Sequence, residues 1–407
     1  MQNELDVSAA APDGASLVRG SNQSGMRAHN ERLVLSLIRQ RGPMAKADIA
    51  RASGLSAQTV SVIMRALESD GLLIKGAPVR GKVGQPSVPM RLAEDGAYFL
   101  GLKIGRRSAE LVLTNFLGRV QNRVHLTHRF PTPAATIDFA CNSVAQLLAQ
   151  LAAADRAKVA GLGIAMPFQL WAWARALSVP DSAMAAWRDV DIRAELAQRF
   201  EFPVFLQNDA SAACGAELVF GQSETPQDFL YFYVGYFIGG GVVLNGGLYA
   251  GRSGNAGALG SLPIASDTGK SQQLIDVASL SVIEAQLSAT GADSASLWQP
   301  PAAWDVDPGI LADWIEGAAA GIAYAIAAAI SVIDFEAVLI DGWIPAEVRE
   351  QITRRTSAHL DMLNLAGLTR PDIREGTVGP DARALGAASL PLSERFLIDT
   401  NALLKAG

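Results

Sequence analysis

The chain has 407 residues, of which 49% are apolar, and its formal net charge is −6. This length excludes a single ordinary domain and predicts two or three, and the apolar fraction suffices for well-filled cores. The charge is uneven, because residues 26–92 hold eleven Lys or Arg against four Asp or Glu, a net of +7. A basic segment attached to an acidic body indicates that one part meets phosphates and the other does not.

Three features indicate the compartment. Cys141 and Cys214 have no neighbours at zinc or redox spacing, so both are expected to be small buried residues of a reduced, cytoplasmic protein. The N-terminus lacks a basic start followed by an apolar run, and no secretory signal is expected. Residues 317–333 are almost wholly apolar, but their many alanines favour membranes weakly, and Glu316 and Asp334 bracket them. We expect a buried core helix there and no membrane contact.

The first part of the chain predicts a tail and three helices. Residues 1–25 are rich in Ala, Ser, Gly and Asn without periodicity, which is typical of a disordered tail. From Asn30 apolar residues recur at helical spacing, and a second helix is expected over residues 46–53, ending at Gly54. Ser56 is the expected N-cap of a third helix. The apolar inner face of that helix consists of Val60, Ile63, Met64 and Leu67.

Residues 45–73 carry the pattern of a helix-turn-helix. Ala50 is small, as close packing of the two helices requires, and Gly54 permits the turn. Two short runs, 72–75 and 88–92, flank a loop with Gly and Pro and indicate a two-stranded wing. Together these features predict a winged helix-turn-helix DNA-binding domain over residues 26–93. A helical hairpin packed for other reasons is the alternative.

The third helix and the wing supply the candidate DNA contacts. Gln58 and Arg65 face outward, and such side chains read base edges through paired hydrogen bonds. Thr59 lies in the first turn, where hydroxyls and free backbone N–H groups meet phosphate. Arg80 and Lys82 flank glycines in the wing, which either approaches a groove or contacts phosphates alone. The expected DNA-binding residues are Lys46, Ser56, Gln58, Thr59, Ser61, Arg65, Arg80, Lys82 and Gln85.

After Asp95 strands alternate with helices, which predicts α/β lobes. A helix is expected over residues 136–151. The expected strands cover residues 98–104, 109–114, 119–125, 159–165, 204–207, 231–234, 239–244 and 338–340.

Four stretches in this part carry a family resemblance. They are GLGIAMP at 161–167, QNDASAACGAE at 207–217, IGGGVVLNGGLYAG at 238–251 and GNAGALG at 254–260. In this order and spacing they resemble the ROK family of bacterial repressors and sugar kinases, over nearly everything from Asn30 onward. The family repressors have a winged helix in front, which its kinases usually lack.

The resemblance implies an actin-like, two-lobed ATPase (ribonuclease H-like) fold for residues 94–407, which would serve as sensor and oligomerisation domain. Lobe one is expected over about 94–208 plus the C-terminal helix, and lobe two over about 209–385.

Candidate ligand groups follow the strand ends. Asn208 and Asp209 succeed an apolar strand, where open α/β sheets gather ligand groups, and an amide beside a carboxylate suits sugar hydroxyls. The resemblance implies that Asp209 matches the general base of the family kinases; an Asn-Asp turn that only caps the next helix is the alternative. Phe168, Trp171 and Trp173 would stack on a sugar or polyol ring or pack the lobe. The expected ligand-binding residues are Asn208, Asp209, Asn255, Ser261, Phe168 and Trp171.

Several positions depart from the family kinases. Lys103 stands where the phosphate loop has its aspartate, and residues 235–239 (GYFIG) replace the second phosphate motif, Gly-Thr-Gly-Ile-Gly. The late Gly-Gly pair near the adenine site becomes Asp341-Gly342. Phosphoryl transfer needs positioned metal and phosphate clamps, so neither catalysis nor a cofactor is expected.

The family's sugar-binding groups are also changed. Ala258 stands in place of a glutamate for sugar hydroxyls, and Ser261 in place of a histidine that binds sugar and zinc. No Cys occurs after residue 214, and a metal site is therefore not expected.

The leading hypothesis is a cytoplasmic transcription regulator of double-stranded operator DNA, in the sense of a repressor of carbohydrate or polyol uptake and catabolism genes. A small sugar-like effector in the interlobe cleft would control it, and a homodimer or homotetramer would read a two-fold symmetric operator. A sugar kinase with an accessory DNA-binding domain and a ligand-independent DNA-binding protein are the alternatives.

Overall fold

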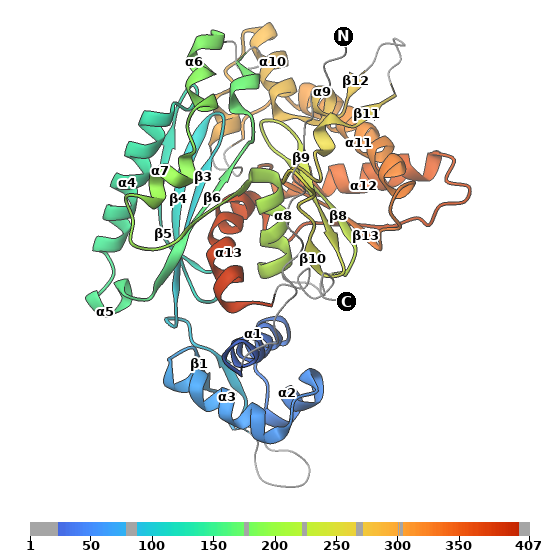
Figure 1. Ribbon diagram of the computed structural model, residues 1–407. Coiled ribbons are helices and arrows are strands. Elements are labelled where there is room, and N and C mark those ends of the chain that lie inside the picture. The colour runs from blue at the N-terminus through green and yellow to red at the C-terminus, as the bar shows by residue number, and fades with distance from the viewer. Residues whose placement is uncertain are drawn as a thin grey trace, which may run out of the picture.

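The computed structural model describes residues 23–78, 88–174, 179–221, 226–265, 272–299, 301 and 304–398. A small N-terminal domain lies below two lobes (Figure 1). Its elements are α1 (Gln23–Arg41), α2 (Lys46–Ser53), α3 (Ala57–Ser69), β1 (Leu73–Lys75) and β2 (Met90–Leu92), and the two strands pair antiparallel. The expected second helix and wing strands are confirmed. The predicted inner face of α3 is also confirmed, because its four apolar residues are buried.

The turn between α2 and α3 follows from two residues. Gly54 ends α2 with a φ of 71°, in the left-handed region that glycine adopts without strain. Ser56 then caps α3, accepting a hydrogen bond from the Thr59 backbone N–H at 3.1 Å.

The first helix is longer than the sequence indicated. Residues 1–25 were expected to form a tail, but α1 begins at Gln23. Residues 25–29 are exposed on all sides, so this first part of the helix carries no apolar stripe that could reveal it.

Lobe one contains a five-stranded sheet with the order β5-β4-β3-β6-β7. The first three strands form an antiparallel meander, and β6 and β7 run parallel to β3. The strands are β3 (Tyr98–Ile104), β4 (Ser108–Asn115), β5 (Val120–Thr127), β6 (Val159–Met166) and β7 (Val204–Asn208). These bounds confirm the expected strands to within two residues.

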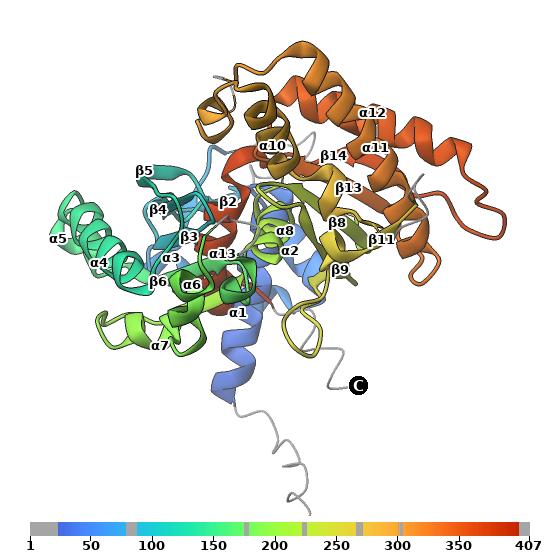
Figure 2. The same cartoon turned by 90° about the horizontal axis from the view of Figure 1, so that it is seen from above.

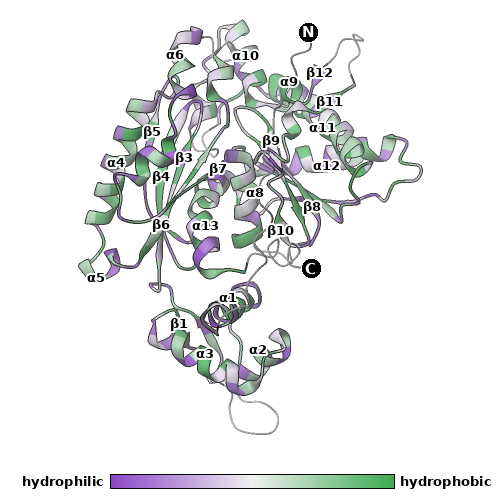
Figure 3. Cartoon of the chain, in the orientation of Figure 1, coloured by the Kyte–Doolittle hydropathy of each residue, from purple (hydrophilic) through white to green (hydrophobic). Residues whose placement is uncertain are grey.

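Helices cover the outside of this sheet. They are α4 (Pro133–Ala149), α5 (Ala153–Arg156), α6 (Asp181–Ala185) and α7 (Ile192–Ala197), with short turns η1 (Leu170–Trp173) and η2 (Ala186–Arg188). Polar and apolar residues alternate along α4 (Figure 3). Its Ala140, Val144 and Leu147 are buried against the sheet, which explains why this helix was recognised from its spacing.

Lobe two contains a second five-stranded sheet with the order β10-β9-β8-β13-β14. Its strands are β8 (Phe229–Val234), β9 (Gly239–Leu244), β10 (Gly247–Leu248), β13 (Ala337–Gly342) and β14 (Asp372–Glu375). The edge strand β14 was not expected, because three of its four residues are charged and none is fully buried. A separate pair joins β11 (Pro263–Ile264) to β12 (Gln272–Gln273).

The outer helices of lobe two are α9 (Ile275–Ala278), α10 (Leu280–Thr290), α11 (Pro308–Ile330) and α12 (Ala346–Met362), with turns η3 (Leu259–Ser261) and η4 (Ala295–Trp298). Within the described part of the chain, α11 is the one helix long and apolar enough to cross a membrane. Its Trp314, Ile322 and Ile326 are buried in the core of lobe two. The expected core helix is therefore confirmed.

Two helices, α8 (Asp209–Phe220) and α13 (Ala382–Phe396), lie between the sheets (Figure 2). They approach closely because small residues line the contact. A Cβ at Gly386 would overlap the backbone of Ala212 on α8, and a Cβ at Gly163 on β6 would overlap that of Ala387. Cys214 is buried in this layer, whereas Cys141 on α4 is partly exposed. Burial was thus confirmed for one of the two cysteines.

The core of the N-terminal domain continues into the lobes. Val34 and Ile38 of α1 belong to the same buried cluster as Phe99 of β3, Phe116 after β4 and Phe396 of α13. Phe396 packs edge to face on Phe99 and Phe116, with ring centroids 5.9 and 5.0 Å away. A shared core transmits displacement between the two domains, since packed interiors are poorly compressible.

Candidate DNA-binding surface and interlobe site

The outer face of α3 presents a polar strip to solvent. Gln58 and Arg65 are exposed, and Arg65 Nε donates to the Ser61 carbonyl at 3.2 Å. Ser61 is half-buried, and its hydroxyl lies 3.4 Å from Lys46 Nζ on α2. Val62, 47% exposed, lies among them, and an exposed apolar side chain on such a face suits a thymine methyl group.

The start of α3 offers a phosphate position. The Ser56 and Thr59 hydroxyls lie 2.8 Å apart at the positive end of the helix dipole, where anions bind favourably. The remaining expected DNA contacts, Arg80, Lys82 and Gln85, lie outside the described residues.

A half-buried arginine joins α1 to the lobes. The Arg39 guanidinium donates to the Phe116 carbonyl and lies 5.4 and 5.9 Å from the ring centroids of Phe116 and Phe220. Burial lowers the pKa of Arg39 to about 10. Just after α13, Ile398 N donates to Ser36 Oγ at 3.1 Å. Thus α1 contacts the ends of both α8 and α13, the two helices that separate the lobes.

The interlobe site begins with an ion pair between those helices. Asp209, the first residue of α8, is buried, and its carboxylate lies 3.5 Å from Arg383 in the first turn of α13. The Arg383 guanidinium also lies 4.9 Å from the Tyr233 ring centroid. Burial opposes its charge, but Tyr233 and Asp209 outweigh burial and raise the pKa of Arg383. The ion pair therefore occupies the Asp209 carboxylate with a guanidinium group.

Two further cations line this site. Lys103 is 4% exposed, and its Nζ donates to Ser108 Oγ at 2.6 Å. Burial, with repulsion from Arg383, lowers the pKa of Lys103 to about 7. Arg106, 9% exposed, lies 4.4 Å from the Phe237 ring centroid, and burial lowers its pKa to about 10.

Aromatic side chains occupy the region of the second phosphate motif. The Tyr236 ring centroid lies 4.8 Å from that of Phe237 and 5.4 Å from that of Trp298. Trp343, which follows β13, donates from Nε1 to the Leu297 carbonyl at 3.0 Å. These rings stand where the family kinases need backbone that approaches phosphate closely.

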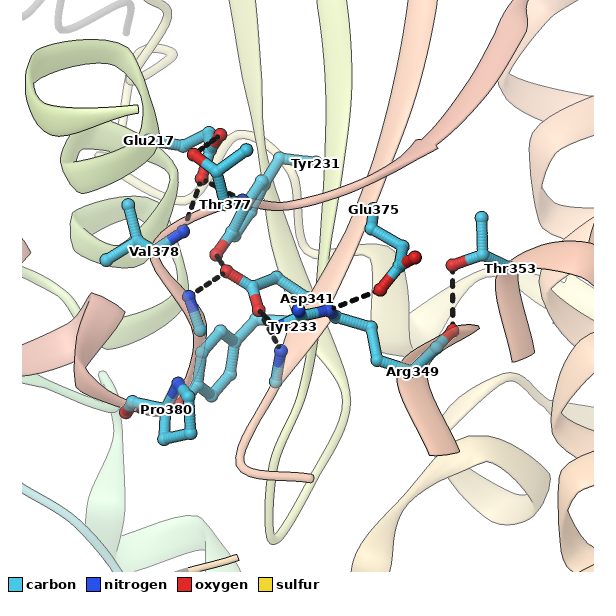
Figure 4. Close-up of polar contacts among 12 residues, drawn as sticks. Glu217, Tyr231, Tyr233, Asp341, Arg349, Thr353, Glu375, Thr377, Val378 and Pro380 are labelled. Carbon is cyan, nitrogen blue, oxygen red and sulfur yellow. Dashed lines mark hydrogen bonds and ion pairs between the residues drawn. The ribbon is translucent and has the colours of Figure 1, made fainter. Parts of the chain in front are cut away.

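Asp341 occupies the position of the late glycine pair and is fully buried (Figure 4). Its carboxylate accepts from Gly379 N at 2.9 Å and from the Tyr231 hydroxyl at 3.1 Å, and Arg349 lies 3.4 Å away. Burial raises the pKa of Asp341, and these donors oppose the rise. The carboxylate therefore fastens the loop after β14 to β13.

Glu217 fastens the same loop from α8 (Figure 4). Its carboxylate accepts from Thr377 N at 2.9 Å and from Val378 N at 3.1 Å. This loop leads through η6 (Gly379–Asp381) into α13. The buried carboxylates of Asp341 and Glu217, which hold the loop, therefore fix the start of that helix.

The expected sugar-binding pair lies at the start of α8. Asn208 Oδ1 accepts from Ala210 N and Ser211 N at 3.0 and 3.3 Å, which is the capping role that the sequence left as an alternative. Asp209 faces Arg383, as described above.

The structure does not bring the other expected ligand residues together at either cavity. The Phe168 ring lies against Gly254, in the loop that carries Asn255. Asn255 and Ser261 are exposed, and Trp171 packs against the lobe-one core. The Trp173 side chain lies outside the described residues.

A cavity of about 470 Å³ opens between the lobes, and none of the expected ligand-binding residues lines it. The Arg107–Glu284 ion pair, with an oxygen 3.1 Å from Nη2, connects the lobes at its wall. Its other lining residues are Thr127, His128, Arg129, Asp293, Ser294, Ala295 and Trp298. In the part of the chain that the structure describes, no three His, Cys, Asp or Glu side chains form a metal-binding group.

Sequence reasoning missed Arg106 and Arg383 as site residues and treated Lys103 only as a lost aspartate. Arg106 and Arg107 follow Lys103 closely, and this basic run was a usable signal. Arg383 lies about 280 residues further along the chain. Only the packing of α13 against β3 and β6 brings it to Lys103.

The fold and site define a class: a winged helix-turn-helix joined to an actin-like, two-lobed α/β domain, as expected from the sequence. The ROK family model matches residues 99–394, and a winged helix-turn-helix DNA-binding model matches residues 27–74. The chain belongs to the ROK family.

Known proteins resemble both parts. A xylose repressor of Bacillus spizizenii is 25% identical over 60% of this chain and 62% of its own length, which is less than two thirds of that relative. The crystal structure of a ROK family transcriptional regulator, a homologue of the E. coli Mlc protein, matches 93% of this chain and 98% of that one, with 22% identity and a TM-score of 0.67.

A ROK family glucokinase from Streptomyces griseus, in complex with glucose and AMPPNP, matches 72% of this chain and 99% of that one, with 20% identity and a TM-score of 0.54. At these identities the solved structures show the fold alone.

Proposed function

We propose that this protein is a sugar-responsive transcription regulator that binds double-stranded operator DNA and has no sugar kinase activity. The observation that carries the proposal is the continuous core between the winged helix-turn-helix and the α13 end of a kinase-like lobe pair. The similarity to xylose repressors supports the repressor sense and a carbohydrate ligand. The proposed regulator would act in the cytoplasm, where its operator DNA lies.

DNA recognition follows from the α3 surface. Gln58, Val62 and Arg65 would face base edges in the major groove, and Lys46 and the α3 N-terminus would meet phosphates. One domain reads only a few base pairs, so we propose a dimer or a dimer of dimers on a two-fold symmetric operator.

The ligand signal passes along α13. Its first turn carries Arg383 in the interlobe site, and its last residue, Phe396, packs beside α1. A ligand that changes lobe closure moves α13 and with it the winged helices. Such a ligand changes DNA affinity only to the extent that it binds the open and closed arrangements of the lobes with different affinities.

Selection of random double-stranded DNA by the full-length protein, followed by anisotropy titration of the selected sequence, tests the DNA-binding part. Arg65→Ala is expected to weaken binding by about 1–3 kcal/mol and to relax preference at one base position. Arg193→Ala is the matched control, since Arg193 is an exposed arginine on α7 of lobe one. Failure to enrich any sequence would reject the proposal.

The kinase alternative is tested with ATP, Mg²⁺ and a panel of sugars. Lys103, Phe237 and the Asp209–Arg383 ion pair predict no turnover above background. Turnover at an ordinary enzymatic rate would support the alternative. Operator binding that no sugar or sugar derivative alters would support the ligand-independent alternative.

A further inference from the structure

Three cations from two segments of the chain meet at the base of the interlobe site. Lys103 lies near the end of β3, Arg106 in the turn to β4, and Arg383 in the first turn of α13. They line one small cavity, and its other lining residues are Gly105, Arg107, Ser108, Tyr236, Trp298 and Trp343. We call these three residues the cation cluster.

The cation cluster carries more positive than negative charge. Asp209 is the carboxylate that pairs with it, through Arg383 at 3.5 Å. Glu110 is also buried nearby, but its carboxylate pairs with Arg123 at 3.0 Å. Lys103 donates to a neutral hydroxyl, and Arg383 Nε is buried without a hydrogen-bond partner among the described residues. When all three side chains are protonated, three cations thus face one unshared carboxylate among the described residues, an excess of two positive charges.

Such an excess is unfavourable in a buried place. Burial and mutual repulsion lower the pKa of Lys103 to about 7, and burial lowers that of Arg106 to about 10. Arg383 also stands in the first turn of a helix, where the dipole disfavours a cation and favours an anion. A bound dianion would relieve all three effects at once.

We propose that the cation cluster is an anion subsite that binds the phosphoryl group of a phosphorylated sugar directly, without an intervening metal. The inference rests on the proposed function, because it names the class of the effector. A phosphoryl group carries close to two negative charges and three acceptor oxygens, which matches the excess charge and the donors of two arginines and a lysine.

The adjoining cavity provides room for the sugar ring. It shares Arg107 and Trp298 with the cation cluster's cavity, and its volume of about 470 Å³ lies in the range of small-molecule sites. Glu284, Asp293 and Ser294 offer polar atoms for hydroxyls. The Arg107–Glu284 pair bridges the lobes at the wall of this larger cavity, and Arg107 also lines the smaller one.

Inorganic phosphate is the probe that needs no knowledge of the sugar. At constant ionic strength, phosphate is expected to raise the melting temperature of the full-length protein relative to chloride, because it binds the native state. Lys103→Met and Arg106→Met are expected to abolish the rise. Lys158→Met, the same change at a lobe-one surface lysine that pairs with Asp155, is expected to keep it. No rise in the parent protein, or an equal rise in all variants, would overturn the inference.

Calorimetric titration with matched pairs of sugars and sugar phosphates shows whether the bound phosphoryl group belongs to a phosphorylated sugar. A phosphorylated member is expected to bind at least about tenfold more tightly than its parent sugar, and Lys103→Met to remove most of that difference. Equal binding by a sugar and its phosphate, or by a sugar acid and the phosphate, would overturn the phosphoryl assignment.

The melting temperature without ligand distinguishes a ligand-binding role of Lys103 from a merely structural one. Without ligand, Lys103→Met is expected to melt no lower than the parent, because it removes an unbalanced buried charge; a large drop would contradict the cation cluster. DNA selection is measured separately. Sequence-specific DNA binding without any phosphate effect would reject this inference and leave the proposed function standing. A phosphate effect without sequence-specific DNA binding would reject the proposed function and leave the anion subsite standing.

Discussion

Lys103 has the most unusual environment of the residues in the interlobe site. Its neighbours on other elements include Arg383 on α13, Glu110 on β4 and Asp209 on α8. Burial lowers the pKa of His125 and His128, and the charge of Lys103 lowers both further. Where a sugar kinase of this family needs an aspartate, this chain buries a cation. In the inference drawn above, that replacement is one of several by which a site for a metal and phosphates becomes one that binds an anion directly.

The buried lysine predicts a pH effect on stability. Its pKa is about 7 in the folded chain and about 10.5 when unfolded, so between these values the unfolded chain binds more protons and stability rises with pH. We expect Lys103→Met to be more stable than the parent at pH 6, by about 1–4 kcal/mol. The difference should shrink as pH rises to 9. Urea unfolding across this range measures it, and parallel pH profiles for the two proteins would contradict the pKa assignment.

The roles of some residues could be predicted from the sequence, and those of others could not. Spacing alone identified Gly54, Ser56 and the inner face of α3, because caps, turns and amphipathic helices are local. Asn208 could not be assigned in the same way, since capping a helix and binding a hydroxyl use the same amide group.

At the scale of elements, α13 connects the two halves of the molecule. Its buried small residues allow close contact with α8, its start is fixed by the loop that Asp341 and Glu217 hold, and its end packs on α1. In the proposed mechanism, a shift at Arg383 is passed along α13 to Phe396 and from there to α1.

The end of α13 is therefore a coupling point. Phe396→Leu is expected to cost about 0.5–1.5 kcal/mol of stability through lost ring contacts with Phe99 and Phe116. It should reduce the effect of ligand on DNA affinity while leaving ligand affinity unchanged. Anisotropy and calorimetric titrations on the same protein measure the two quantities. Phe202→Leu, a partly buried position stacked on Phe200 in lobe one, is the control. Full ligand response in Phe396→Leu would exclude transmission through this contact.

Elements differed in how well the sequence revealed them. Buried strands such as β3 and β9 have continuous apolar or glycine-rich runs, and their bounds were predicted to the residue. The edge strand β14 and the first part of α1 are polar and exposed, so no hydrophobic pattern marks them. Both are elements whose structure depends on neighbours rather than on their own sequence.

At the scale of the whole molecule, the resemblance supplied the two-lobed fold, and departures from the family pattern supplied the argument against catalysis. What the sequence could not provide was the convergence of Lys103, Arg106 and Arg383, because loop closure over hundreds of residues leaves no local signature. The same limit applies to the shared core between α1, β3 and α13.

The central claim is that binding in the interlobe site changes binding to DNA. Titration of the selected operator DNA with full-length protein, with and without a saturating compound that binds the interlobe site, tests it most directly. The predicted result is a change in DNA affinity of about 5- to 150-fold, with a reciprocal change in affinity for the compound when operator is present. An operator affinity that stays the same at ligand saturation would contradict the claim.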